Sequence, residues 1–139
     1  MFYGEYHHQL DDKGRFRIPP DFRKQLGENP MMMLSFEKCL ILYTQNDFTE
    51  RVEKRFENAD ILNTKMSDLK RVIFPMAQPV VEDKQGRVLL NRKFIETCGM
   101  SKNIVSIGTM DRVEIWDEDM YKKHMESIDF DKILASFTE

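Results

Sequence analysis

The chain has 139 residues, which fits one ordinary domain and is too short for two large independent ones. Hydrophobic residues make up 41% and charged residues 32%, which is typical of a folded globular protein, and no apolar run approaches the roughly 20 residues of a membrane-spanning helix, so a cytoplasmic protein is expected. The net charge of −3 argues against a uniformly basic nucleic-acid-binding surface, but charge is segregated: residues 83–103 hold five Lys or Arg against two acids, and residues 111–139 hold four against nine.

The first predicted unit begins with a hairpin. Strands are expected over 6–10 and 15–18, because Asp11 and Gly14 occupy the first and fourth positions of a tight turn between them. An Asp four residues before Arg15 can form an ion pair that fixes the hairpin. The turn is then either a purely structural feature or a binding feature, and the local pattern leaves both open.

A short helix and two strands follow this hairpin. The helix is expected over residues 19–27, because Pro20 suits an early helical position and Gly27 suits the C-terminal stop. The strands are expected over 31–36 and 39–43. The first of them opens with three methionines, which are typical of an edge strand that covers the core or of an adaptable contact surface.

Residues 48–76 are expected to form a helical linker. Asp47 with Glu50 three residues later resembles a capping box at its start, and a second helix is expected over 67–74. The apolar residues of the first linker helix recur at helical spacing: Phe48, Val52 and Phe56.

The first unit then recurs at an offset of 72 residues. The matching pairs are Asp11 with Asp83, Gly14 with Gly86, Arg15 with Arg87, Phe22 with Phe94, and Gly27 with Gly99. We therefore divide the chain into a first repeat (5–47), the linker (48–76), a second repeat (77–121) and a C-terminal helical segment (122–139). A repeat of about 45 residues cannot bury enough apolar surface alone, so the two repeats are expected to interlock in one core.

The second repeat contains the same elements as the first. Strands are expected over 79–82 and 87–90, and Asn91 is the expected N-cap of the following helix. Strands over 104–109 and 113–116 come next. A further helix is indicated by acidic residues that suit a helix N-terminus: Asp117, Glu118 and Asp119.

The C-terminal segment carries an apolar stripe at helical spacing, made of Phe130, Ile133, Leu134 and Phe137. We expect this stripe to cover the body of the protein. The alternatives are that it joins neighbouring subunits or binds another partner.

Catalytic and metal-binding patterns are missing from the sequence. Cys39 and Cys98 lie in apolar stretches of the sequence, which predicts two buried thiols rather than a disulfide. His7 and His8 are adjacent on a strand and point to opposite faces, and His124 is distant, so no metal site is expected. We expect neither an enzyme nor a cofactor nor a small-molecule substrate.

The chemistry of the sequence is concentrated in its two turns. Each turn has a Lys at or near its tip, Lys13 or Lys84, and an Arg just beyond it, and two such turns side by side would form one basic ridge. The planar guanidinium of Arg forms bidentate hydrogen bonds with phosphate oxygens or a guanine edge, and the ammonium group of Lys acts as a mobile charge. Further cations follow each turn: Arg17, Arg23 and Lys24 in the first repeat, and Arg92 and Lys93 in the second. An ion pair that fixes the turn does not explain Arg17, Arg23 and Lys24, and these cations favour turns that bind phosphate.

These residues resemble the bacterial MraZ family of transcriptional regulators over essentially the whole chain, in the stretches "MFYGEY", "LDDKGRFRIPPDFR", "EDKQGRVLLNRKF" and "VEIWDEDMY". The resemblance implies an α+β, mainly β fold: a pseudo-two-fold, AbrB-like swapped-hairpin barrel with accessory helices. It also implies a ring-shaped homo-oligomer in the nucleoid that binds direct repeats upstream of the division and cell wall gene cluster.

The resemblance implies DNA contacts from the loop that follows Asp11. Lys13 and Arg15 are thereby implied directly, and Lys84 and Arg87 by internal symmetry. The second turn departs from the first at two positions, because Gln85 aligns with Lys13 and Leu89 with Arg17.

A ring also follows from physical reasoning. Apolar surface left over after the repeats interlock, for which the methionine run is a candidate, would join subunits head to tail, and such contacts can close into a ring. A ring presents the turns of all its subunits in the same direction and should therefore favour direct repeats over palindromes. Each subunit makes few contacts with DNA, and the binding of several subunits to one duplex compensates by raising the overall affinity. The competing class is a protein-binding scaffold of antitoxin-like type. RNA binding ranks last, because no aromatic pair on a sheet is indicated.

Overall fold

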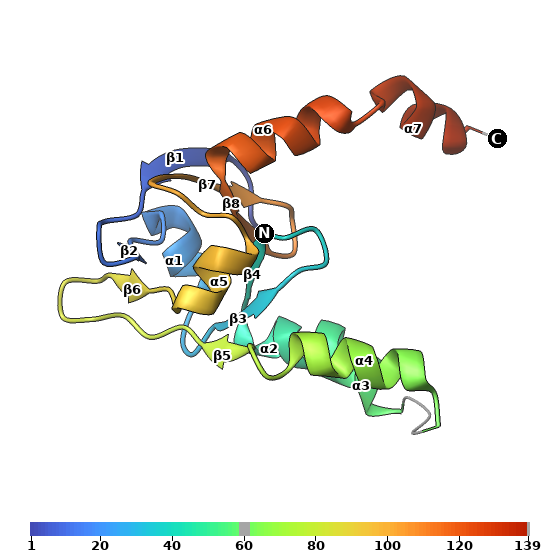
Figure 1. Cartoon of the computed structure of the whole chain (residues 1–139), viewed down its shortest axis with the longest axis horizontal. Helices are drawn as coiled ribbons and strands as arrows, with labels where there is room; N and C mark the ends of the chain where they lie inside the picture. The colour runs from blue at the N-terminus through green and yellow to red at the C-terminus, as the bar shows by residue number, and fades with distance from the viewer. Residues whose placement is uncertain (59–61, 139) are drawn as a thin grey trace.

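The computed structural model describes residues 1–58 and 62–138 and has an α+β fold with two antiparallel sheets (Figure 1). Residues 59–61 of the predicted linker and residue 139 lie outside the described part. The strands are β1 (Glu5–Gln9), β2 (Arg15–Phe16), β3 (Met31–Leu34), β4 (Leu40–Tyr43), β5 (Gln78–Pro79), β6 (Val88–Leu89), β7 (Asn103–Gly108) and β8 (Val113–Asp117). The helices are α1 (Pro20–Leu26), α2 (Gln45–Asp47), the π-helix η1 (Phe48–Glu53), α3 (Lys54–Glu57), α4 (Thr64–Ile73), α5 (Arg92–Thr97), α6 (Glu118–Ser127) and α7 (Phe130–Ser136).

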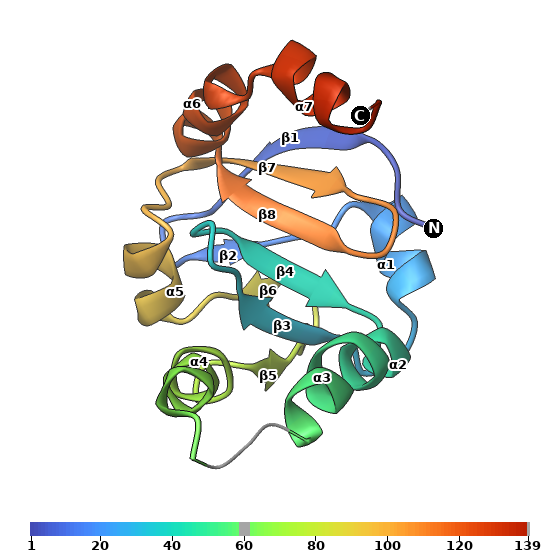
Figure 2. The same ribbon diagram turned by 90° about the vertical axis from the view of Figure 1, so that its right-hand side faces the viewer.

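The sheets are built from both repeats. The larger sheet has the strand order β1-β7-β8-β4-β3-β5, and the smaller one pairs β2 with β6. Exchanging the equivalent strands of the two repeats (β1 with β5, β3 with β7, β4 with β8) gives the same order read from the other edge of the sheet. Figure 2 shows the order running from β1 to β5, with α6 and α7 beyond one end and α3 and α4 at the other. Because β1 pairs with β7 and β5 pairs with β3, each repeat completes the sheet of the other, so the predicted interlocking is confirmed.

The main core lies between these sheets and the two short helices. Phe22 of α1 and Phe94 of α5 are completely buried in one cluster to which both repeats contribute. Phe22 also meets the ring of Tyr6 edge-on, at a centroid distance of 5.1 Å. A second cluster lies where the linker helices pack on β3 and β4, and it contains the three residues of the predicted helical stripe: Phe48, Val52 and Phe56.

Two local predictions need correction. The first linker helix is capped by Thr44, whose hydroxyl accepts a hydrogen bond from the backbone N–H of Asp47 at 3.0 Å, so the predicted capping box of Asp47 and Glu50 is wrong. The methionine run is not left over for contacts between subunits, because Met32 and Met33 are buried inside the sheet. Their strand lies between β4 and β5, and β5 pairs with it at Met31 and Met32.

The C-terminal segment also differs from expectation. Asp117 caps α6 by accepting from the backbone N–H of Met120, as the acidic run predicts. The following α7 extends beyond the body (Figure 1). The four residues of the predicted stripe, three in α7 and Phe137 just after it, are all exposed, up to 84% for Phe137, so the prediction that they cover the core is wrong. None of the described helices is long and apolar enough to cross a bilayer.

Candidate nucleic-acid interface

The first turn, residues 11–15, is organised by the carboxylate of Asp11. One oxygen, Oδ1, accepts hydrogen bonds from the backbone N–H groups of Lys13 and Arg15, both at 2.9 Å. The other, Oδ2, accepts from Nε of Arg15 at 2.7 Å. Gly14 donates its N–H to the carbonyl of Asp11 and has a φ of +78°, which favours glycine. The tip is therefore held by backbone and side-chain bonds together.

The second turn, residues 83–87, repeats this geometry. Asp83 accepts from the backbone N–H groups of Gln85 and Arg87 at 2.9 Å and from Nε of Arg87 at 2.9 Å. Gly86 has a φ of +75°. The Asp–Arg ion pair that could fix each hairpin is thus present in both turns, and it occupies Nε of each Arg.

The two turns lie side by side. The short sheet pairs Arg15 with Leu89 and Phe16 with Val88, and Leu90 donates its N–H to the carbonyl of Gly14 at 2.9 Å. A terminal nitrogen of Arg87 also lies 4.0 Å from Oδ2 of Asp11. The predicted juxtaposition of the turns is therefore confirmed.

Hydrogen bonding stabilises the charged form of both aspartates. The backbone N–H of Arg15, helped by its guanidinium and by the N–H of Lys13, lowers the pKa of Asp11. The backbone N–H groups of Arg87 and Gln85 and the Arg87 guanidinium lower the pKa of Asp83 in the same way. The turns therefore keep their ion pairs at neutral pH.

The remaining predicted cations surround the paired turns. Arg17 donates from Nε to the carbonyl of Gln85 at 3.2 Å, Arg23 pairs with Glu82 at 2.7 Å, and Arg92 of α5 pairs with Glu96 of its own helix at 3.0 Å. Three exposed lysines form no ion pair within the described part of the chain: Lys13, Lys24 and Lys84. The structure thus places all nine predicted cations, including Lys93 of α5, on the two turns or on the elements that follow them.

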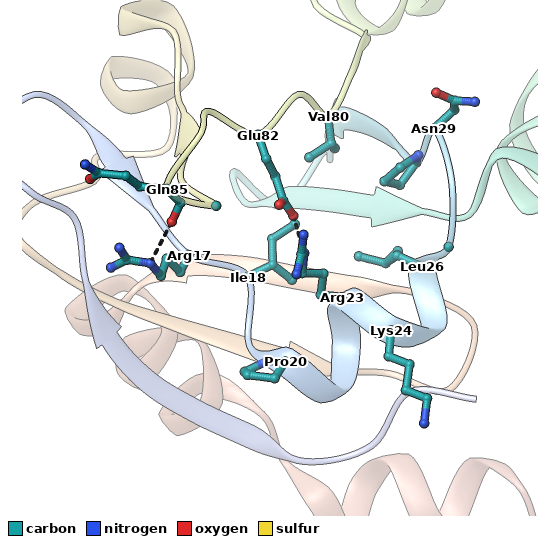
Figure 3. A pocket seen from close by; sticks show the side chains of 13 residues that line it. Arg17, Ile18, Pro20, Arg23, Lys24, Leu26, Asn29, Val80, Glu82 and Gln85 are labelled. Atoms are coloured by element: carbon teal, nitrogen blue, oxygen red, sulfur yellow. Dashed lines mark hydrogen bonds and ion pairs between the residues drawn. The ribbon is translucent and has the colours of Figure 1, made fainter.

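A groove of about 720 Å³ lies between α1 and the second turn (Figure 3). We call it the first groove. Arg17 and Arg23 point toward residues 80–85 across it, whereas Lys24 extends away from them. Glu82 and Gln85 hold the two arginines, a role that the sequence does not predict because contacts over 59 and 68 residues leave no local pattern.

The other titratable candidates lie apart from the turns. His7 pairs with Glu5, His8 contacts the Ser106 hydroxyl, and His124 pairs with Glu37. Within residues 1–58 and 62–138, no three His, Cys, Asp or Glu side chains are arranged to hold a metal ion. Both predicted buried thiols, Cys39 and Cys98, are buried, and this burial raises the pKa of each to about 12.

Comparison with known proteins agrees with this geometry. The family described as "MraZ protein, putative antitoxin-like" matches residues 1–70 and again residues 73–136, one match for each repeat. The protein named "Transcriptional regulator MraZ" of Clostridium acetobutylicum is 35% identical over 140 residues, which cover 100% of this chain and 98% of the relative. Its namesake in Clostridium botulinum is 37% identical with the same coverage. The one in Dictyoglomus thermophilum is 39% identical over 88% of this chain and 84% of the relative. The chain therefore belongs to the MraZ family, a family of transcriptional regulators and not of enzymes.

Proposed function

We propose that this protein is a transcriptional regulator that binds double-stranded DNA through its two paired turns. The observation that carries the proposal is the β2–β6 pairing, which brings two lysine-tipped turns into one surface. A surface of this kind attracts the phosphate backbone even though the chain as a whole is anionic. The proposed contacts are Lys13, Arg15, Arg17, Arg23, Lys24, Lys84, Arg87 and Arg92.

The arginines and lysines of the turns have different proposed roles. Arg15 and Arg87 are held through Nε, and their side chains are 25% and 24% exposed, so each guanidinium is oriented in advance for phosphate or base edges. One terminal nitrogen of Arg87 also faces Asp11, at 4.0 Å. Lys13 and Lys84 are exposed at the tips and supply mobile charge. The same residues can therefore both fix the turn and bind DNA.

The finer parts of the proposal concern assembly and target. We infer an AbrB-like swapped-hairpin barrel, a closed ring of subunits, and binding to direct repeats upstream of the division and cell wall gene cluster, in the cytoplasm and at the nucleoid. The exchange of first strands between the repeats supports the swapped hairpin. The division into residues 5–47, 48–76, 77–121 and 122–139 belongs to the same proposal.

Fluorescence anisotropy with two duplexes of equal length tests the proposal. One carries the sequence upstream of the division and cell wall genes, and the other has random sequence. We expect both to bind at low salt, with the upstream duplex preferred by about 10³-fold or more near physiological salt. Absence of binding to both duplexes would reject the proposed function.

A second candidate function, as a protein-interaction scaffold, is favoured by one observation. The apolar stripe of α7 is exposed, and a helix of seven residues is too short to be stable alone in water. A neighbouring subunit is the partner that we propose for it, because contacts between identical chains build the ring.

Introducing charge into this stripe is expected to break the assembly. A double variant, Phe130→Asp with Phe137→Asp, places two carboxylates in the proposed contact, and we expect its mass by light scattering to fall toward the 16.6 kDa of one chain. Lys132→Asp places a carboxylate on the opposite side of the same helix and serves as the control, with an unchanged mass. A wild-type protein that is already monomeric would contradict the ring.

A further inference from the structure

The two-stranded ribbon of β2 and β6 has one face in the core and one face open to solvent. Phe16 and Val88 pair across the ribbon, and each is 2% exposed and belongs to the main core. Successive side chains of a strand point to opposite faces, so the neighbouring pair, Arg15 and Leu89, lies on the outer face. Leu89 is 59% exposed there. The outer face therefore presents an apolar side chain directly opposite a guanidinium group.

This leucine breaks the symmetry of the outer face. At the offset of 72 residues, Arg15 corresponds to Arg87, and Arg17 corresponds to Leu89. The alternation of side chains places all four residues on the outer face, which carries three arginines and one leucine. The first repeat therefore has a cation at a position where the second repeat has an exposed apolar group.

Val81 enlarges the apolar surface beside Leu89. A bridge between Glu82 and Val88 sets the segment before the second turn alongside β6. Val81 is 72% exposed, and it lines a second groove, of about 620 Å³, together with Leu89 and the two turn arginines. Two acids also line this groove, and both are paired with arginines: Glu82 and Asp83. The second groove thus combines guanidinium groups with exposed apolar side chains.

The two turns lie at opposite ends of the ribbon, because β2 and β6 are antiparallel. The carbonyl of Gly14 in the first turn accepts from the N–H of Leu90, just after β6. The carbonyl of Gln85 in the second turn accepts from Nε of Arg17, just after β2. Both turns project on the side of the body away from α4 and α7 (Figure 1). A two-stranded ribbon fits the major groove of DNA, which is about 12 Å wide, and the lysine tips at its ends would then face phosphates.

We propose that Leu89 is a specificity-determining residue, which contacts the 5-methyl group of a thymine in the major groove, beside Arg15. This rests on the proposed DNA-binding function. Phosphate contacts carry no sequence information, so recognition of a particular site needs contacts with base edges. Thymine presents its methyl group in the major groove, and apolar side chains recognise it there. The cations around Leu89 bring this side chain, together with Val81, to the anionic duplex.

Replacing thymine by deoxyuridine tests the proposal, because it removes the methyl group and keeps the base pair. A duplex selected by the wild-type protein from a random pool has its thymines replaced one at a time, and competition fluorescence anisotropy measures binding of the full-length protein. We expect replacement at the contacted position to weaken binding about fourfold, the effect of one buried methyl group. If no replacement weakened binding, the methyl contact would be overturned and the proposed function would stand. Failure of wild type to bind any duplex would instead reject that function.

Variants of Leu89 connect the effect to this side chain. Leu89→Ala is expected to bind the thymine duplex about fourfold more weakly than wild type and to bind the thymine and deoxyuridine forms equally. Leu89→Arg, which copies Arg17 of the first repeat, should also lose the sensitivity to deoxyuridine, while the added charge makes the salt dependence of log K steeper by about 0.9. The control is Val72→Ala, at a side chain of α4 that is 46% exposed, and it should keep the wild-type sensitivity. If Leu89→Ala were as sensitive as wild type at every position, the role of Leu89 would be overturned.

Discussion

Replacing Phe22 or Phe94 by alanine is expected to lower the free energy of unfolding by about 3–5 kcal/mol each, because the cavity lies in a closely packed core. Both side chains are completely buried, and each occupies the equivalent position in its own repeat. The core around them contains residues of both repeats. Either substitution should therefore destabilise the whole chain and not one half of it.

Urea denaturation at fixed protein concentration measures this effect. Fluorescence of Trp116 reports on the β8 region and far-UV circular dichroism reports on all elements, and we expect the two to give one coincident transition in each variant. Leu89→Ala, at a side chain that is 59% exposed, is the control and should change stability by less than about 0.5 kcal/mol. Two separate transitions, only one of them shifted by Phe94→Ala, would show that the repeats fold independently and would contradict the interlocked core.

Reversing the charge at both turn tips is expected to cause the largest loss of DNA affinity. The double variant Lys13→Glu with Lys84→Glu replaces two proposed phosphate contacts by repulsion. Charge-assisted hydrogen bonds contribute roughly 1.5–3 kcal/mol each, so the loss of two should weaken binding by about 10² or more. Neither lysine forms an ion pair within the described residues, so the fold should not change. Fluorescence anisotropy with a random-sequence duplex at low salt measures the affinity.

A matched control separates local contact from overall charge. Lys122→Glu with Lys123→Glu changes the net charge by the same amount on exposed positions of α6, at the end of the molecule beyond β1 (Figure 2). We expect a much smaller loss, and one that disappears as salt is raised, because only long-range attraction is reduced. Equal losses from the two double variants would mean that the turns are not the contact surface.

The features that could be predicted from the sequence are those set by residues close together in the chain. Asp11 and Gly14 define a turn on their own, because the Asp carboxylate bonds to the N–H groups of the next few residues and Gly accepts a positive φ. Asn91 and Asp117 cap their helices as expected for the same reason. The repeat then extended these local predictions to the second half of the chain and indicated that the turns would meet.

The features that could not be predicted depend on contacts between distant segments. Thr44 and Asp47 are both good capping residues, and only the packing of Phe48 against the sheet decides where the helix begins. The surroundings of the methionine run could not be predicted, because the pairing of β5 with Met31 and Met32 joins segments far apart in the chain. The bond between Arg23 and Glu82 could not be predicted, because it joins residues 59 positions apart in the chain.

Photo-crosslinking from the turn tips tests the central claim most directly. A photoreactive amino acid placed at Lys13 or Lys84 should crosslink to duplex DNA on irradiation, and the same group placed at Lys70 of α4, away from the turns, should not. High salt should abolish the crosslinks, because the contact is with phosphate. Crosslinking from Lys70 with none from either tip would contradict the account, since it would place DNA on the linker helices instead of the paired turns.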